Sequence, residues 1–570
     1  MTRAIRAPIC EDPSRDSSRS IHDIPPELLA RIFILCLPPS AERHDDVGWI
    51  VVTEICRAWR AVALSCPELW SNIILEPEVA SLMITRAKMA PLSFFVELDD
   101  DDEEPLSDEN LDHIRHGIGR TSQLDLFGSP WQLQWLLVQL PSAPMLSSIS
   151  VHNCDPNAML WLDFYVFAAP PGEGIPRQLH LSRCAFRWES TWYSQLTELD
   201  LADLTEEQGP SWTRLFEIIS SCPRLEYLRL ANINTRVDAS VPTRRHTATH
   251  LRTLHLFEPA SFCGRLLRRL ALPQIAEIHI KCTLGGEVYE NFLEDVKALI
   301  VPAFAFPYEH VRVNTHCERG SSGGKDTVLS FAAASAFAEK KIKLKFICPH
   351  PARLLLPILQ TLTRHREDSL HSVTVLDIDT TADWKEGLDM LTWSFFARCK
   401  SLQSLFVRRG PPHHLLCAIF ERAMRRIGVC CRQEGWFEKH IGLVPGSPEQ
   451  VFPDLEHIDL QQIDLQEVTV KLATEDEPGH WCSYERLLRA TLWARWAGNA
   501  GVRTLSMHGC PFKTWEPAFA TQEVILDGTS FDDLVLSLTD CNGRGRAESF
   551  AYFEAQSSDL QRLFGSGFRT

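Results

Sequence analysis

The chain has 570 residues, 45% of them hydrophobic and 23% charged, a composition typical of ordinary globular proteins rather than disordered ones. Its 57 lysines and arginines stand against 74 aspartates and glutamates, so the formal net charge is −17. This balance argues against a general nucleic-acid binder and against a protein held on anionic membranes, because both rely on clustered positive charge. The longest apolar run, 159–169, is interrupted by Asp163 and is shorter than the roughly 18 residues of a membrane span, so we expect neither partner.

Residues 1–20 are rich in Ser, Arg and Asp and contain little that could be buried, which predicts a disordered leader. Glu11, Asp12 and Asp16 stand where a secretory signal would need its apolar segment. The 18 cysteines are scattered along the chain, and without such a signal we expect them to be reduced thiols. Together these features predict a cytoplasmic or nuclear protein.

Residues 21–75 show helical periodicity. Asp23, followed by Pro25 and Pro26, is a typical helix start, because proline has no amide hydrogen to leave unpaired in the first turn. Apolar residues then recur at helical spacing in two stretches that end at prolines, the first comprising Ile24, Leu28, Ile32 and Leu35 and the second Val51, Ile55, Trp59 and Val62. The pattern predicts a small all-α module, and a generic helical hairpin is the simplest alternative.

The same stretch resembles the F-box, and its motifs occur here in the family's order. They are Ile24-Pro25-Pro26-Glu27-Leu28-Leu29, Ile32-Phe33, Ile55-Cys56-Arg57-Ala58-Trp59-Arg60 and Pro67-Glu68-Leu69-Trp70. The departures are Ile24 for the usual Leu and Ile55 for the usual Val. The resemblance implies docking on a Skp-type adaptor and, through it, on a cullin. Helix-in-groove binding uses apolar anchors, so the predicted adaptor-binding residues are Ile24, Pro25, Leu28, Leu29, Ile32, Phe33, Val51, Ile55 and Trp59.

Residues 76–120 form a predicted connecting segment that contains an acidic loop. The stretch from Glu97 to Asn110 holds nine acids and no lysine or arginine. Because its charges repel one another, we expect this loop to be exposed.

From residue 121 to 545 one short pattern recurs. It has apolar residues at its first, fourth and sixth positions, and the three positions between them vary. Clear copies begin at Leu196, Leu225, Leu251 and Ile275, with steps of 29, 26 and 24 residues. This is the period of leucine-rich repeats, in which each unit supplies a short strand and a helical return. The copies resemble the irregular leucine-rich repeats that accompany F-boxes. Helical insertions are expected at 415–427 and 484–496, and a helical tail at 546–570.

The predicted fold class is therefore mixed α/β, a small all-α F-box followed by an irregular leucine-rich-repeat α/β solenoid. A flat multi-domain α/β enzyme is the alternative architecture.

Signals of catalysis are weak. The segment from Ser322 to Thr327 resembles the phosphate-cradling loop of the ATP-pyrophosphatase family, with a possible strand before it and a helix expected near Val328. A surface loop is the favoured interpretation, because seven mostly polar residues separate that strand from the loop. The cluster of histidines and cysteines at 413–440 contains no Cys-x-x-Cys pair to anchor zinc. We expect no enzyme activity, no cofactor and no bound metal.

The middle residue of each repeat strand should face outward, because side chains alternate along a strand. In the middle repeats these residues are cationic or protonatable, namely Arg229, His255, His279, Arg312 and Lys345. Stacked on neighbouring strands they would form a positive strip that binds a target protein through its acidic or phosphorylated segments. The alternative is that strand alternation merely requires polar residues at these positions and that their charge is incidental. The resemblance to F-box proteins with leucine-rich repeats implies the predicted function, a non-catalytic substrate receptor of an SCF-type ubiquitin ligase. The alternatives are a Skp-binding scaffold outside a ligase and a nucleotide-binding enzyme that uses the 322–327 loop.

Overall fold

The structure is a computed structural model, and its chain divides into two compact units. Unit 1 comprises residues 1–210 and 234–236, and unit 2 comprises residues 211–233 and 237–570. The residues described are 24–37, 48–98, 106–158, 160–162, 176–186, 192–205, 207, 209–235, 245–273, 275–283, 308–319, 325–335, 340–347, 371–380, 396, 399–409, 452–463, 468–474, 477–483, 488, 492, 502–508, 510 and 523–527. The predicted leader at 1–20, the insertion at 415–427 and the tail at 546–570 lie outside them.

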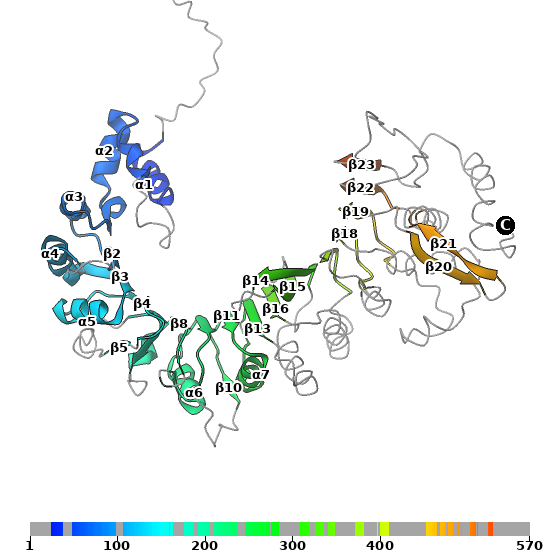
Figure 1. Cartoon of the computed structure of the whole chain (residues 1–570). Helices are drawn as coiled ribbons and strands as arrows, with labels where there is room; N and C mark the ends of the chain where they lie inside the picture. The colour runs from blue at the N-terminus through cyan, green and yellow to red at the C-terminus, as the bar shows by residue number, and fades with distance from the viewer. Residues whose placement is uncertain are drawn as a thin grey trace, which may run out of the picture. The chain divides into compact units, whose positions relative to one another are not determined.

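Unit 1 begins with short helices, α1 (Pro26–Leu35) and α2 (Arg57–Ser65), and with 3-10 turns at Gly48–Thr53 and Pro67–Trp70. Pro26 occupies the first turn of α1, where its missing N–H costs no hydrogen bond. The amide of Trp59 donates to the Cys56 sulfur and caps the start of α2. The helices thus begin where the sequence offers a proline or a capping side chain. Figure 1 labels α1 and α2 near the start of the described chain.

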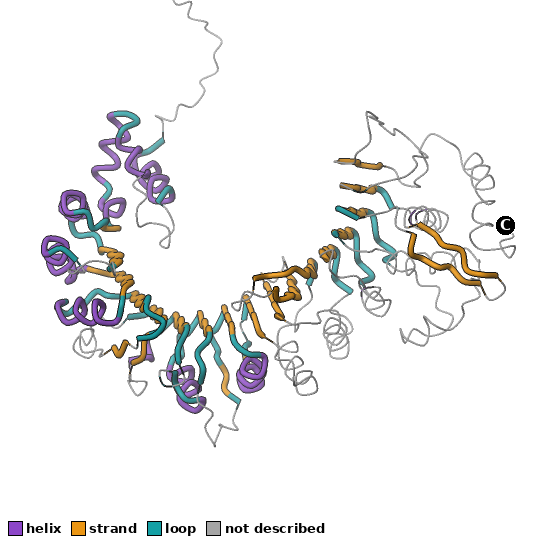
Figure 2. The backbone as a smooth tube through the Cα atoms, viewed as in Figure 1, coloured by secondary structure: helices purple, strands orange, loops and turns teal. Residues whose placement is uncertain are grey.

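A parallel sheet follows in unit 1, with consecutive strands side by side. Its strands are β1 (Asn72–Ile73), β2 (Leu92–Glu97), β3 (Thr121–Gly128), β4 (Ser148–Asn153), β6 (Gln178–Ser182) and β8 (Glu198–Ala202). Helices α3 (Pro77–Ala87), α4 (Asp108–Gly117) and α5 (Pro130–Gln139) lie on one side of these strands (Figure 2). Strands β5 (Leu160–Leu162) and β7 (Cys184–Phe186) form a separate parallel pair. Each successive stretch of the chain in unit 1 therefore contributes one strand and a return segment, as in a repeat-like solenoid.

The sheet starts earlier than the predicted repeat boundary at residue 121. The segment 76–120, expected to be a connector, contributes α3, β2 and α4 to the sheet and its helical layer. The reason is visible in β2, where Leu92, Phe94 and Val96 are all buried while the residues between them are not. This alternation of apolar residues is the pattern of a half-buried strand.

Unit 2 is also built from parallel strands joined by return segments. Its first elements are α6 (Trp212–Ser221), β9 (Tyr227–Ala231), β10 (His246–Thr247), β11 (Thr253–Phe257), α7 (Ala260–Arg269), β12 (Leu270–Ala271) and β13 (Glu277–Thr283). Strands β9, β11 and β13 are parallel neighbours in register, and β10 pairs with β12 in a separate short ladder. The three strand segments predicted at 225, 251 and 275 are confirmed.

A hairpin interrupts the parallel order of unit 2. Strand β13 pairs with β16 (Lys340–Ile347), which is antiparallel to β15 (Lys325–Ser335), which is antiparallel to β14 (His310–Arg319). From β14 the parallel order resumes through β17 (Val375–Thr380), β18 (Ser404–Arg408), β19 (His457–Gln461), β22 (Thr504–His508) and β23 (Glu523–Asp527). The strand order is therefore not the chain order in this region.

One sequence-based expectation changes here. Val328, where a helix was expected after a phosphate-binding loop, lies in β15 and pairs with His316 and Ile347 of the flanking strands. In the predicted helical insertion 484–496 only Leu488 and Leu492 are described; both are helical and buried. Just before it, β20 (Val468–Thr474) and β21 (Glu477–Ser483) form an antiparallel pair.

The fold is thus mixed α/β with a large sheet dominated by parallel pairs, which confirms that part of the predicted class. None of the helices described is both long and apolar enough to cross a membrane.

Candidate functional sites

The helical module at residues 24–70 has a core of its own. Leu29 and Phe33 of α1 are buried, and the Phe33 ring lies 5.1 Å from the ring of Trp59 on α2. The indole N–H of Trp70 donates to the Ala63 carbonyl at 2.9 Å and ties the 3-10 turn at Pro67–Trp70 to α2. These contacts place the two short helices against each other.

The same module also exposes large apolar side chains. The exposed fractions are 56% for Leu28, 42% for Ile32, 78% for Leu35, 55% for Val51 and 54% for Ile55. We call these five residues, with the exposed Pro25, the apolar surface of the module. Scattered exposed apolar residues are ordinary, but several on one small module make it a candidate interaction surface.

The nine predicted adaptor-binding residues therefore fall into two groups. Leu29 and Phe33 belong to the core, and Ile24 and Trp59 are half-buried. The other five lie on the apolar surface, namely Pro25, Leu28, Ile32, Val51 and Ile55. Leu35 was missing from the prediction, although it continues the helical spacing of Leu28 and Ile32.

A second candidate site lies on the outward face of unit 2. Because β9, β11, β13 and β16 pair in register, Arg229, His255, His279 and Lys343 stand side by side on four neighbouring strands. We call these four residues the basic row. Two residues further along their strands, Phe257, Lys281 and Lys345 are also register partners and form a second row beside the first.

The basic row is held in place by aromatic contacts. The guanidinium of Arg229 lies 5.3 Å from the centre of the Phe257 ring, a cation–π geometry that fixes its position. The rings of His255 and His279 are 5.4 Å apart, and Phe257 meets His279 edge-on at 5.0 Å. The Tyr227 hydroxyl lies 3.3 Å from Nδ1 of His255. The row is therefore partly preorganised.

The fixed positive charges of the basic row, Arg229 and Lys343, stand at its two ends. Burial lowers the pKa of His279 to about 4, and His255, Lys343 and Lys345 lower it as well, while Glu277 acts in the opposite direction. His279 is therefore neutral at pH 7. Arg229 and Lys343 carry the fixed charge of the row, and Lys281 and Lys345 lie in the second row beside it.

Two of the predicted strip residues stand elsewhere than expected. Lys345 is level with Lys281 rather than with His279, whose register partner is Lys343. Arg312 is separated from His279 by β16 and β15. Its Nη2 and Nε lie 2.6 and 2.7 Å from the Asp377 carboxylate on β17. The predicted continuous strip of five is corrected to a row of four that ends at Lys343.

The outward face of unit 1 has a different chemistry. His180 on β6 lies 3.6 Å from Asp200 and 3.9 Å from Glu198, both on β8. On β3 and β4 the rings of Phe127 and His152 stack at 4.4 Å. Acids and aromatic rings therefore occupy the positions that cations occupy in unit 2.

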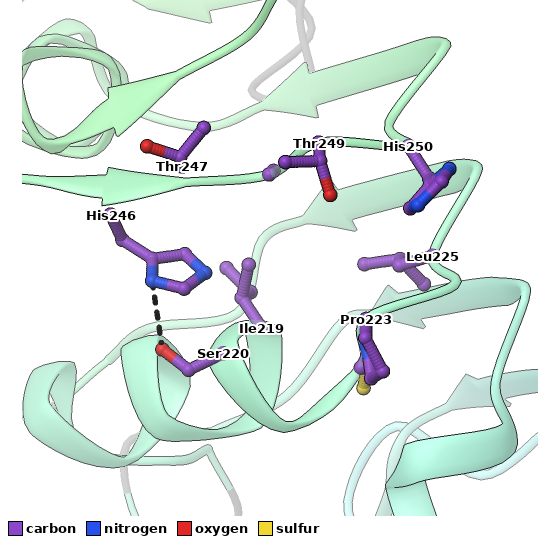
Figure 3. Close-up of a pocket in the computed structure, with 10 residues that line it drawn as sticks. Ile219, Ser220, Pro223, Leu225, His246, Thr247, Thr249 and His250 are labelled. Atoms are coloured by element: carbon purple, nitrogen blue, oxygen red, sulfur yellow. Dashed lines mark hydrogen bonds between the residues drawn. The ribbon is translucent and has the colours of Figure 1, made fainter.

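A small cavity of about 120 Å³ lies between the end of α6 and β10 (Figure 3). The imidazole of His246 faces the Ser220 hydroxyl, with 3.2 Å between Nδ1 and Oγ. That hydroxyl donates to the Phe216 carbonyl at 2.6 Å, so its proton is already engaged. The lining residues described include no carboxylate to orient the histidine, as a nucleophilic serine site would require.

Neither the thiol beside the cavity nor a metal-binding cluster adds reactivity among the residues described. Burial raises the pKa of Cys222, beside the cavity, to about 12, which keeps this thiol protonated. Among the residues described, no group of three or more His, Cys, Asp or Glu side chains is placed to hold a metal ion. The 413–440 cluster lies outside those residues.

The segment considered as a nucleotide loop also has a different setting. Lys325, Asp326 and Thr327 belong to β15 and pair with Arg319, Glu318 and Cys317 of β14. A phosphate-binding loop of the expected kind presents its amides at a helix N-terminus. Here a strand follows instead, so the nucleotide-binding alternative loses its structural basis.

Comparisons with known proteins give few matches. No protein-family model matches the sequence, and no curated protein matches it. A solved structure similar to this chain is the functional domain of InlJ from Listeria monocytogenes, described as including a cysteine ladder, with 14% identity over 41% of this chain and a TM-score of 0.15. The match spans about half of that chain, 54%. A TM-score this low assigns neither a fold nor a function.

Proposed function

We propose that this protein is a non-catalytic substrate receptor of an SCF-type ubiquitin ligase, built from an F-box and leucine-rich-repeat-type units. The F-box would dock on a Skp-type adaptor and, through it, on a cullin. The observation that carries the proposal is the apolar surface formed by Pro25, Leu28, Ile32, Leu35, Val51 and Ile55.

The arrangement of the module supports this role. Leu28, Ile32 and Leu35 follow one another at helical spacing on α1, which is how a helix presents anchors to a partner's groove. Their neighbours Leu29 and Phe33 are already used in the core. The helix therefore has two apolar sides, and only one of them is covered within unit 1.

The repeat-like sheet supports the receptor half of the proposal. Its strands present rows of polar outward residues with distinct chemistry, such as the basic row, and such surfaces bind other proteins without reacting with them. The mechanism would be proximity, since a receptor that holds a target near a transfer enzyme raises its effective concentration there.

The test uses the full chain and a purified Skp-type adaptor. The double variant Pro25→Ala, Leu28→Ala should bind the adaptor at least about 30-fold more weakly, because truncating a buried interface anchor costs about 2 kcal/mol or more. Leu82→Ala on α3 is the control, since Leu82 is also exposed (45%) but lies outside the module. Full adaptor binding by the folded double variant would refute the F-box assignment.

Co-purification of a cullin with the adaptor then separates the two remaining roles. A receptor brings the cullin along, whereas a Skp-binding scaffold outside a ligase captures the adaptor alone. The second result would replace the receptor by the scaffold.

A further inference from the structure

We propose that the basic row of unit 2 binds an extended polypeptide segment that carries carboxylates at alternate positions. The proposal rests on the proposed function only in assigning that segment to the target protein. It is carried by the register of β9, β11, β13 and β16 and by the charges that this register brings together.

The charge of this face is unusual for the chain. The described outward residues of the four strands include Arg229, Lys281, Lys341, Lys343 and Lys345, and Glu277 is the acid among them. The whole chain, by contrast, has a net charge of −17. A cationic face on an acidic protein favours anionic partners through complementary potential.

The spacing of the row indicates what kind of anion fits. Neighbouring strands lie about 4.8 Å apart, so the three steps from Arg229 to Lys343 span about 14 Å. An extended chain advances about 3.3 Å per residue, and its residues i, i+2 and i+4 point to the same side and span about 13 Å. A segment crossing the strands would thus place carboxylates i and i+4 on Arg229 and Lys343.

The middle of the row suits the residue between them. His255 and His279 stand between the two cations, and Nε2 of His279 is a buried nitrogen without a hydrogen-bond partner among the residues described. Since burial and neighbouring cations hold the pKa of His279 near 4, this imidazole is a neutral hydrogen-bonding group at pH 7. An approaching carboxylate would favour its protonation, because opposite charge stabilises the charged form.

The geometry favours carboxylates over a single phosphate group. A phosphate dianion is bound by several donors that converge on one point. In the basic row the charges are instead distributed over successive strands, and the Arg229 guanidinium is already placed over Phe257. One carboxylate for each cation matches this distribution.

The experiment measures binding of fluorescent ten-residue peptides to the full chain by anisotropy. A peptide with three glutamates at alternate positions should bind at least about fivefold tighter than a peptide of the same composition with the three glutamates adjacent. The affinity should fall with salt, because exposed charges are screened. Equal affinity for both arrangements would overturn the proposal.

Variants locate the site. Arg229→Ser with Lys343→Ser should weaken binding at least about tenfold, and Lys343→Glu alone should do the same, since Lys343 is exposed and its charge reversal leaves the core untouched. Arg224→Ser with Arg268→Ser removes the same charge from exposed positions outside the row and should have little effect. Equal losses in both double variants would overturn the proposal.

Two further probes decide the chemical class. Tighter binding of a peptide with one phosphoserine, or equal binding of a single-stranded oligonucleotide that Lys343→Glu abolishes, would each overturn the assignment to carboxylates. Adaptor binding is measured on the same variants. If adaptor binding is normal while the peptides fail to bind, the inference falls and the proposed function stands. If the unmodified chain does not bind the adaptor, the proposed function alone is refuted.

Discussion

Glu258 is a buried acid whose removal should change the pH dependence of stability. Only 3% exposed, it follows β11 and accepts a hydrogen bond from the Ile233 amide at 2.6 Å. That amide lies next to Asn232, which holds a left-handed backbone with φ of 53°. Burial raises the pKa of Glu258 to about 7, although the Ile233 hydrogen bond lowers it in part. Glu258→Gln keeps an oxygen that can accept from Ile233 but cannot ionise.

The magnitude follows from the pKa difference between the folded and unfolded states. The ordinary value is 4.5 and the folded value about 7, so the folded state binds more protons between these two pH values. The contribution of Glu258 is therefore fully present below pH 4.5 and is lost as the pH rises through 7. A shift of this size corresponds to about 3 kcal/mol. Relative to the unmodified chain, Glu258→Gln should thus gain up to about 3 kcal/mol at pH 8.5 and little at pH 4.5.

Urea unfolding at several pH values measures this difference. Tryptophan fluorescence is a suitable signal, because Trp212 of unit 2 packs against Phe262 of α7, with 4.5 Å between the ring centres. Glu226→Gln, at an exposed glutamate just before β9, is the matched control and should show no such trend. If the stability difference between Glu258→Gln and the unmodified chain does not depend on pH, the reasoning is refuted.

Two further predictions concern packing in unit 1. Phe33→Ala should destabilise the chain by about 3–5 kcal/mol, whereas Leu28→Ala should cost about 1 kcal/mol or less because Leu28 is 56% exposed; equal costs by urea unfolding would contradict the assignment of core and surface. Gly117→Ala should lower the free energy of unfolding by about 1–3 kcal/mol, and with it the melting temperature, because a Cβ there would lie 2.7 Å from Phe94 Cζ. Gly119→Ala meets nothing within 4 Å and should leave the melting temperature unchanged or slightly raised; a similar loss in both would refute the steric argument.

Much of the sheet was predictable because strand alternation is a local property. In β8, β9, β11 and β13 the apolar positions of the repeat pattern are the buried ones, and the residue between them faces outward. The same pattern also fits Val373, Leu376 and Ile378, which the sequence analysis did not include and which flank or form β17. The same rule therefore also predicts this strand, with Asp377 between its buried apolar positions.

The apolar surface of the helical module was predictable only in part. Helical spacing identifies which residues are apolar, but α1 is apolar on two sides, so spacing alone does not distinguish the core from the surface. Leu29 and Phe33 are buried, and the Phe33 ring contacts Trp59 of α2, whereas Leu28 and Ile32 are exposed. That distinction depends on where α2 packs, which is tertiary information.

The order of the strands could not be read from local pattern at all. Chain order would place Arg312 next to His279, and the hairpin of β14, β15 and β16 instead places Lys343 there. Arg312 then meets Asp377, a buried acid for which it is the nearest cation described, with Arg408 further away at 3.6 Å. A buried carboxylate is costly unless it is paired, so Arg312 serves the stability of unit 2. Arg312 and Lys343 thus have different neighbours, because a long-range strand pairing decides which residue each one meets.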